Sequence, residues 1–368
     1  MRALIECMSN ANCTANQTSI VILSSFHFAT AICEDCRKAG EDIWYLYSLR
    51  EMGYTTLFAP SGNKELVLMY RQFPDLVKII IMEGTAAHAC FVDPDCIKTP
   101  KSPLGIPAWK MLSLHFWGGS AHPLGNSWTL SPENYSRISS GDSKDNVYLG
   151  YSIERTCLNT PITPISERPQ RAYVLSKKVS YFSKDNYAWS KVSLIPPFHL
   201  TLVAGMINDT EHESSVTASI VNLGLMNQVE FYRELGQSRA LIGIGSPWLS
   251  PTPYDALCMG VPFINPILKW DRNDPDNRDN WLAQHNGLKY ELPPYVYNVK
   301  RDDTEGLWSA VRAALDNPIE RYIVPAMTME SLKSRVAFVV EKDWKSQAEE
   351  LLAERISSGS DEVRAFID

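Results

Sequence analysis

Short apolar runs alternate with amphipathic stretches along the chain, and this alternation restricts the possible folds more than any other feature. Residues 19–24, 54–60 and 76–82 are rich in β-branched and other apolar residues, as expected of buried strands. Residues 36–52 and 64–75 lie between these runs and have the apolar spacing of helices. Strands that alternate with helices form a parallel sheet with helices on its faces, so the first part of the chain is predicted to be an α/β domain.

A second series of strand-like runs follows a middle segment in which the periodicity fades. Between residues 85 and 137, Pro, Gly, His and Trp accumulate. We expect long loops there, which are either functional or an ordered surface lid around Trp117 and Trp128. A helix is predicted at residues 227–238, and a polar helix at residues 331–356 closes the chain. The strands predicted in this part are residues 146–154, 171–176, 200–206, 240–245 and 261–266.

We therefore predict two successive α/β domains, in residues 1–145 and 146–330, followed by a helical segment in residues 331–368. The 368 residues are enough for two domains of ordinary size. The net charge of -7 argues against a protein that binds nucleic acid through the phosphate backbone. No apolar run approaches the ~20 residues of a membrane span. The N-terminal residues lack the apolar core of a signal peptide, which by itself indicates the cytoplasm.

Cysteines and possible glycosylation sites point instead to the lumen of the secretory pathway. The chain has eight cysteines and four N-x-[ST] triplets, although such triplets also arise by chance and cysteines are often buried thiols. The triplets start at Asn12, Asn16, Asn134 and Asn208. A luminal domain whose membrane anchor lies outside this chain would reconcile all these features. Cys33 and Cys36 have CxxC spacing, but no second zinc half-site accompanies them, so we expect a structural disulfide or free thiols.

The stretch GIGSPWLSPTPYDALCMGVPFINP, residues 243–266, contains a strand end, a small-residue loop, a helix start and another strand in close succession. In open α/β sheets, ligands bind beyond the carboxyl ends of the strands. The free N–H groups and the dipole of a helix N-terminus attract phosphate there, and Asp255 is placed to accept hydrogen bonds from ribose hydroxyls. A plain strand-to-helix connection is the alternative. The residues expected to form the site are Gly245, Ser246, Pro251, Thr252, Pro253, Tyr254 and Asp255.

Residues 221–266 resemble the nucleotide-sugar domain of GT-B glycosyltransferases, most closely family 18, the N-acetylglucosaminyltransferase V family. In that family an N-H-G-x-L segment, a strand ending in G-L-G, a Pro/Gly loop, L-E-A and F-L-N-P follow one another. The counterparts here are residues 222–224, 243–245, 254–256 and 263–266. The resemblance extends from about residue 125 to residue 344. The chain departs from the family at Leu249, where the family has an acidic residue, at Asp255 in place of Glu, and at Leu223 in place of His.

The resemblance implies an α/β protein of the GT-B fold, with two facing Rossmann-like domains and a C-terminal helix. It implies inverting transfer of a sugar from a UDP-sugar, with UDP-GlcNAc as the expected donor. The expected reaction needs no metal and no further cofactor. The expected acceptor is a glycan or glycoprotein, such as a mannose-containing N-glycan. The expected location is the Golgi lumen, with a type II membrane anchor in the full-length protein.

The resemblance also assigns roles to single residues. The general base that inversion requires aligns with Glu41, with Asp42 as the second choice, although an acidic pair at a helix N-terminus also stabilises the helix dipole. Lys177, or its neighbour Lys178, can supply positive charge to the diphosphate, and a solvated loop is the alternative.

On the acceptor side, His27 lies at the predicted tip of the first strand and either contacts the acceptor or packs. Trp117 and Trp128 suit stacking on sugar rings, and structural burial explains them equally well. The two D-P-D segments, at residues 93–95 and 274–276, are expected to be turns rather than metal sites.

Two other functions compete with this interpretation. A non-catalytic glycan- or nucleotide-binding module on the same scaffold would explain the change to Leu249. An unrelated α/β enzyme, such as a nucleotide-sugar epimerase or a hydrolase, is the second alternative. An epimerase should carry a glycine-rich dinucleotide fingerprint after its first strand, and residues 19–31 contain no glycine.

Overall fold

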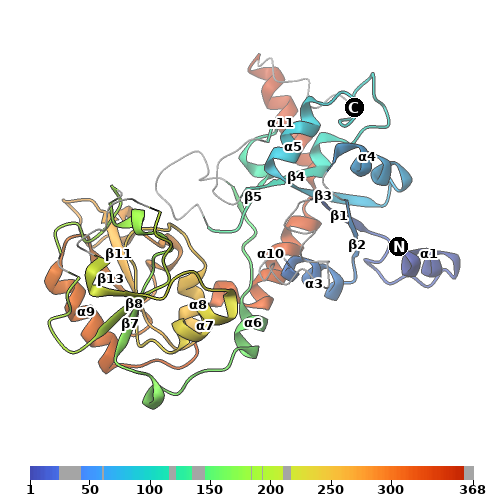
Figure 1. Cartoon of the computed structure of the whole chain (residues 1–368). Helices are drawn as coiled ribbons and strands as arrows, with labels where there is room; N and C mark the ends of the chain where they lie inside the picture. Colours follow the sequence, from blue (N-terminus) through green and yellow to red (C-terminus); the bar gives the residue numbers. More distant parts are fainter. Residues whose placement is uncertain are drawn as a thin grey trace. The chain divides into compact units, whose positions relative to one another are not determined.

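The computed structural model describes residues 1–24, 43–59, 62–115, 122–134, 146–183, 185–192, 194–209 and 217–359. The chain divides into two compact units (Figure 1). The first comprises residues 1–136, 140–152 and 325–368, and the second comprises residues 137–139 and 153–324. Each unit contains a largely parallel sheet with helices, which is the Rossmann-like arrangement of the GT-B fold class. The predicted fold class is therefore confirmed.

The first unit is built on a six-stranded sheet in the order β2-β1-β3-β4-β5-β6, with every pair parallel. Its strands are β1 (Ile20–Ser24), β2 (Thr55–Phe58), β3 (Val77–Glu83), β4 (Met111–Leu114), β5 (Thr129–Ser131) and β6 (Val147–Tyr148). Its first helices are α1 (Arg2–Ser9), α3 (Ile43–Glu51), α4 (Asn63–Gln72) and α5 (Gly84–Val92). All five residues of β1 are buried, which explains why this strand has a continuous apolar sequence.

The predicted loops between residues 85 and 137 are wrong in part, because this segment contains most of α5 and all of β4 and β5. The two strands are four and three residues long and contain polar residues, so they lack a recognisable apolar run. The polar residues are nevertheless buried, and the Ser113 hydroxyl donates to Thr129 Oγ1 at 3.3 Å. The run at residues 146–154 is predicted to begin the second series of strands. Its strand β6 instead pairs with β5 in the first sheet.

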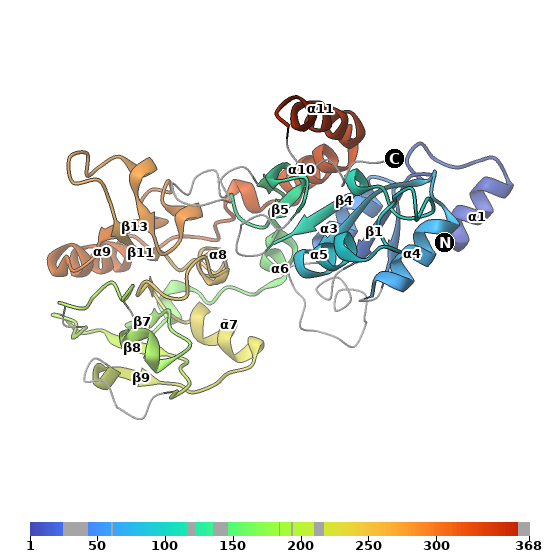
Figure 2. The same ribbon diagram turned by 90° about the horizontal axis from the view of Figure 1, so that it is seen from above.

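The polar helix predicted at residues 331–356 is two helices, α10 (Met329–Glu341) and α11 (Trp344–Ser357). Lys342 is extended, and the Asp343 carboxylate caps α11 by accepting from the backbone N–H and the hydroxyl of Ser346 at 3.0 and 2.7 Å. Both helices belong to the first unit. Helix α10 packs against α3, and Figure 2 shows α10 and α11 running beside the strands of this unit. Residues 325–359 thus complete the first unit.

The second unit contains a seven-stranded sheet, with the order β12-β11-β10-β7-β8-β9 and with β13 also paired to β11. Its strands are β7 (Arg171–Val174), β8 (Thr201–Ala204), β9 (Ile220–Asn222), β10 (Leu241–Ile242), β11 (Phe263–Lys269), β12 (Leu282–Ala283) and β13 (Val296–Lys300). Its helices are α6 (Glu154–Asn159), α7 (Gln228–Gly236), α8 (Thr252–Cys258) and α9 (Thr304–Asp316). All pairs except β11–β12 are parallel. The predicted helix at residues 227–238 is confirmed as α7, which begins with a capping box between Asn227 and Glu230.

Three disulfides join the six cysteines within the described part of the chain, and they are Cys7–Cys13, Cys90–Cys96 and Cys157–Cys258. The third joins α6 to the end of α8 across 101 residues. Closing a loop of that length stabilises a fold by about 4–5 kcal/mol in the chain-entropy model. Cys33 and Cys36 lie outside the described residues. None of the helices that the structure describes has the length and apolar composition needed to cross a membrane.

Candidate functional site

The carboxyl ends of β7 and β10 bring Lys177 and the loop at residues 243–251 to the same edge of the second sheet. The two strands are parallel neighbours, and the N–H of Leu175 donates to the Ile242 carbonyl at 2.8 Å just beyond their paired residues. The Lys177 side chain is exposed, while its carbonyl accepts from the N–H of Ile207 at 3.0 Å. Lys177 and the loop therefore both follow the carboxyl ends of neighbouring strands, at the edge where open α/β sheets bind ligands.

The loop turns sharply at Gly245, whose φ of +98° lies in the region that favours glycine. A side chain at this position would overlap the carbonyl oxygen of Asn186. The Asn186 side-chain amide in turn donates to the Gly245 carbonyl at 3.1 Å and to the Ser246 hydroxyl at 2.7 Å. Glycine is thus required here so that the backbone can pack against Asn186.

Gln284, which follows β12, makes three hydrogen bonds to this loop and a fourth to β11. Its side-chain oxygen accepts from the Gly245 N–H at 2.8 Å, and its side-chain nitrogen donates to the Pro247 carbonyl at 3.0 Å. Its own carbonyl accepts from the Leu249 N–H at 3.1 Å, and its N–H donates to the Pro266 carbonyl at 2.9 Å. Gln284 is 1% exposed. One buried residue therefore fixes the backbone of the loop on both sides of its turn.

The amide hydrogens that the loop offers to a ligand differ from those expected. Because the Gly245 N–H is bonded to Gln284, it does not point to an open diphosphate site. The N–H groups of Ser246, Trp248 and Ser250 make no hydrogen bond with any residue that the structure describes. Trp248 is half-buried, whereas both serines are buried. Trp248 is therefore the least buried of the three residues.

Leu249, which replaces the acidic residue of the family pattern, is 2% exposed and has a φ of +52°. A left-handed conformation at a non-glycine residue costs of order 1–3 kcal/mol. Its aliphatic side chain is buried and offers no charge to a ligand. The loop has therefore exchanged a polar group for a buried apolar one.

The first turn of α8 is mostly buried. Thr252, Pro253 and Tyr254 are all buried, and the Tyr254 ring meets the His285 ring edge-on, with 4.7 Å between ring centroids. Asp255 is half-buried, and its carboxylate accepts from the Tyr232 hydroxyl of α7 at 3.5 Å. Of the residues predicted here, Asp255 and the N-cap Pro251 are thus the two that are not fully buried.

His285 is a buried neutral group behind this turn. Burial lowers its pKa to about 3. The imidazole is therefore uncharged at physiological pH.

The Asn-x-Gly counterpart of the family motif ties two strand ends together. The Asn222 side-chain oxygen accepts from the N–H groups of Met206 and Gly224 at 3.0 and 2.9 Å, and its nitrogen donates to the Met206 carbonyl at 3.1 Å. Gly224 has a φ of +76°. These bonds fix the carboxyl ends of β8 and β9, so the motif shapes the same edge of the sheet.

Arg168 supports the opposite end of α8, and sequence reasoning missed it. Its guanidinium donates to the carbonyls of Ser238, Met259 and Gly260 at 3.2, 2.7 and 2.8 Å, and its Nε donates to the Thr163 carbonyl at 2.8 Å. Burial lowers the pKa of this group. A lone arginine before a strand carries no sequence signal for such a role.

The predicted acceptor-side residues can be placed only in part. Glu41, Asp42, His27 and Trp117 lie outside the described residues. Trp128 is 1% exposed, and its indole N–H donates to the Trp109 carbonyl at 3.3 Å. Its ring also lies 5.5 Å from that of Trp344 in α11. Trp128 therefore has the structural role that the sequence left open.

The carboxyl edge of the first sheet carries two groups that sequence reasoning did not single out. Glu83 ends β3, and His115 follows β4, the neighbouring strand. Burial lowers the pKa of His115, and the Glu83 carboxylate opposes this shift. His115 Nε2 is buried with no hydrogen-bond partner in the described part of the chain.

The two D-P-D segments form turns, as predicted. The Asp93 carboxylate accepts from the Asp95 N–H at 3.0 Å, and the Asp274 carbonyl accepts from the Asn277 N–H at 3.3 Å. Within the described ranges, no three His, Cys, Asp or Glu side chains are grouped as metal ligands would be.

Comparison with known proteins gives a family and several relatives. A family model described as Glycosyltransferase family 18 matches residues 113–353, which is more than half of the chain. Alpha-1,6-mannosylglycoprotein 6-beta-N-acetylglucosaminyltransferase A of Homo sapiens is 22% identical over 227 residues, covering 58% of this chain and 30% of the relative. The Caenorhabditis elegans relative, whose name is the same without the letter A, is 23% identical over 294 residues. The match covers 74% of this chain and 40% of the relative. The chain thus spans less than half the length of these relatives.

Solved structures show only distant likeness. UDP-GlcNAc 2-epimerase of Methanocaldococcus jannaschii, in complex with UDP-GlcNAc and UDP, has a TM-score of 0.42 at 9% identity, covering 88% of this chain and all of that one. HepE of Anabaena in complex with UDP has a TM-score of 0.44 at 10% identity, covering 92% of this chain and all of that one. Likeness at this level assigns neither function nor site. The family match confirms the resemblance found in the motifs, and the chain belongs to glycosyltransferase family 18.

Proposed function

We propose that this chain is an inverting glycosyltransferase that moves N-acetylglucosamine from UDP-GlcNAc to a mannose-containing N-glycan of a glycoprotein. The observation that carries the proposal is the family 18 match over residues 113–353. The curated relatives named above support the same donor sugar and acceptor class through their names. Nucleic acid is not an expected partner of a chain with a net charge of -7.

On the donor side, the proposed site is the edge formed by Lys177 and the loop before α8. The leaving UDP develops charge on its diphosphate, and without a metal that charge must be met by fixed donors. Lys177, exposed at the end of β7, and the unpartnered amide of Trp248 are the groups proposed for this role. Asp255, half-buried in the first turn of α8, is proposed to bind the ribose hydroxyls. Gly245, Ser246, Pro251, Thr252, Pro253 and Tyr254 are proposed to shape the loop.

On the acceptor side, inversion requires a carboxylate that removes the proton from the attacking hydroxyl. Glu41 is the proposed base, with Asp42 as the alternative. His27 and Trp117 are proposed to contact the acceptor. No cofactor beyond the UDP-sugar is proposed, and no metal.

We further propose a location in the lumen of the secretory pathway, in the Golgi, with any membrane anchor outside these residues. Three disulfides among the described cysteines support this location, because structural disulfides persist in oxidising compartments and are rare in the cytosol.

The test is UDP release from UDP-GlcNAc in the presence of a mannose-containing N-glycan, measured with the protein and with its Glu41→Gln and Asp42→Asn variants. Release that needs the acceptor and is lost in Glu41→Gln supports the proposal. The buried Leu249 favours a second candidate, a binding module without catalysis. In that case UDP or glycan binds, as a shift in melting temperature shows, but no UDP is released.

A further inference from the structure

Two N-x-[ST] triplets lie close together in the segment that leads from α1 to β1, and their asparagine side chains have different surroundings. The triplets are Asn12-Cys13-Thr14 and Asn16-Gln17-Thr18. A glycan is joined to the side-chain nitrogen of the asparagine, so the folded protein must leave that nitrogen accessible. The surroundings of the two asparagines therefore predict which one is modified.

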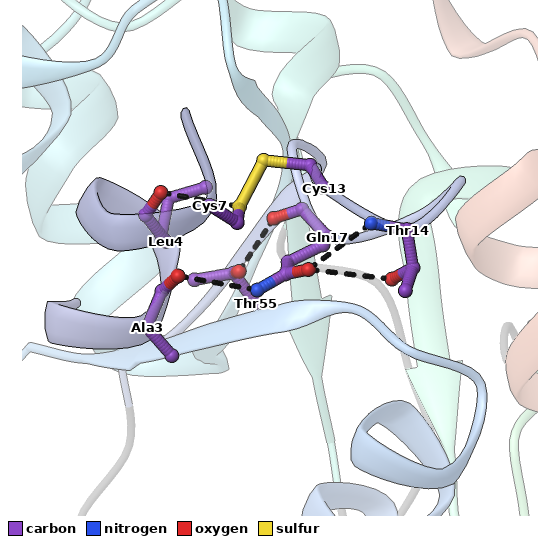
Figure 3. Close-up of a disulfide and its surroundings, with 7 residues drawn as sticks. All are labelled: Ala3, Leu4, Cys7, Cys13, Thr14, Gln17 and Thr55. Atoms are coloured by element: carbon purple, nitrogen blue, oxygen red, sulfur yellow. Dashed lines mark hydrogen bonds between the residues drawn. A yellow bond between two sulfur atoms is a disulfide. The ribbon is translucent and has the colours of Figure 1, made fainter. Parts of the chain in front are cut away.

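The first triplet sits on a turn that is held from several sides (Figure 3). The Cys7–Cys13 disulfide closes the turn, and the Asn12 N–H donates to the Cys7 carbonyl at 3.0 Å. The Gln17 side chain accepts from the Thr14 N–H at 3.1 Å and donates to the Ala3 carbonyl at 3.2 Å. The backbone that carries Asn12 is thus fixed without any contribution from its side chain.

The Asn12 side chain is exposed, and so is Thr14. Asn12 makes no side-chain hydrogen bond with a residue in the described ranges. A sugar on its nitrogen would project into solvent and would break no contact of the fold. Because the turn is rigid, the attached glycan would leave the surface at a defined place.

Asn16, in contrast to Asn12, is held through its side chain. It is half-buried, and its side-chain nitrogen donates to the Met52 carbonyl at 2.9 Å, just beyond the end of α3. Glycosylation replaces one hydrogen of this nitrogen with a bulky sugar. The sugar would have to fit beside the chain at Met52, and the contact that ties this segment to α3 would be lost or displaced.

We propose that Asn12 is an N-glycosylation site of this protein and that Asn16 stays unmodified. In the reaction, the Asn12 side-chain nitrogen forms a bond to the anomeric carbon of an oligosaccharide carried on a lipid diphosphate. The bond from that carbon to the diphosphate oxygen breaks, and the lipid diphosphate leaves with the electron pair. The amide proton passes to a base of the transferring enzyme.

This inference does not depend on the proposed transferase activity, since it requires only that the chain enters the secretory lumen. The three disulfides of the described residues are independent support for that environment.

The test is expression of the whole chain behind a cleavable signal peptide in cultured animal cells, followed by site mapping of the secreted protein. Enzymatic removal of N-glycans converts each modified asparagine to aspartate, and mass spectrometry of the peptides then shows which positions carried sugar. We expect conversion at Asn12 and none at Asn16.

Asn12→Gln and Asn16→Gln form a matched pair, because both remove a triplet from the same segment with the same substitution. Asn12→Gln is expected to lose one glycan in gel mobility, whereas Asn16→Gln is expected to keep the wild-type pattern. Sugar on Asn16, or an unmodified Asn12 in the secreted protein, overturns the proposal. Peptide mapping of the wild-type chain decides the question even where a variant is not secreted.

Discussion

Replacement of Gln284 by leucine would remove the side chain that holds the loop before α8. Leucine is similar in size but can neither donate nor accept, so the Gly245 N–H and the Pro247 carbonyl lose their partners. A buried unpaired amide costs about 1–3 kcal/mol, and a half-buried carbonyl about 1 kcal/mol because water replaces part of its bond. The backbone bonds of Gln284 to Leu249 and Pro266 do not involve its side chain. We therefore expect the free energy of unfolding of the second unit to fall by about 2–4 kcal/mol.

The assay is urea unfolding followed by circular dichroism, together with hydrogen exchange of the Gly245 amide. The two units can unfold separately, so the local exchange measurement shows where stability is lost. Gln347→Leu is the control, because the Gln347 side-chain oxygen is already buried without a partner in the described part of the chain. If Gln284→Leu stays within about 0.5 kcal/mol of the wild type and Gly245 stays protected, the loop is held by something else.

Gln284→Glu adds a pH test of the same geometry. A carboxylate still accepts from Gly245 but cannot donate to Pro247, whereas a protonated carboxyl can do both. Burial raises the pKa of such a carboxyl in the folded state above its unfolded value of about 4.3. The stability supplied by the protonated form is then present below the unfolded pKa and is lost as the pH rises through the folded pKa. The deficit relative to wild type should therefore shrink on acidification, and a deficit that does not change with pH contradicts the assignment.

Three further substitutions test the rest of the site. Gly245→Ala should lower the melting temperature more than Gly224→Ala, because both positions have positive φ but only the first faces the Asn186 carbonyl; equal losses would contradict this packing. Arg168→Met should lower the free energy of unfolding by about 3–5 kcal/mol, measured by urea unfolding, since several buried carbonyls lose their donor. Lys177→Ala should weaken UDP binding in calorimetry by about three- to tenfold with an unchanged melting temperature, and the loss should diminish at high salt; unchanged affinity would remove Lys177 from the donor site.

The elements that could be predicted from sequence are those with long apolar runs or clear helical spacing. β3 has four apolar residues in succession at its centre and was easily recognised. β4 and β5 were missed because Ser113 and Thr129 interrupt any apolar pattern, although each hydroxyl is buried next to the other. The break between α10 and α11 had a local signal, an aspartate three residues before Ser346, which is the spacing of an N-cap.

For the candidate site, the sequence located the loop but not what holds it. A strand that ends in glycine and runs into prolines is visible in residues 243–253 alone. The partner of the Gly245 amide is Gln284, which comes after β11 and β12, so no local pattern links the two residues. The same holds for Asn186, which lies before β8. Contacts between distant segments decided which amide hydrogens remain available to a ligand.

The three disulfides in the described part of the chain differ in how far apart their cysteines lie, with separations of 6, 6 and 101 residues. During vectorial synthesis, Cys7–Cys13 and Cys90–Cys96 can close as soon as their short segments emerge. Cys157 must wait as a thiol until Cys258 has been made, and in that interval it can exchange with other disulfides. Cells poor in disulfide isomerase are therefore expected to accumulate chains that contain Cys7–Cys13 and Cys90–Cys96 while the end of α8 still lacks its covalent tether.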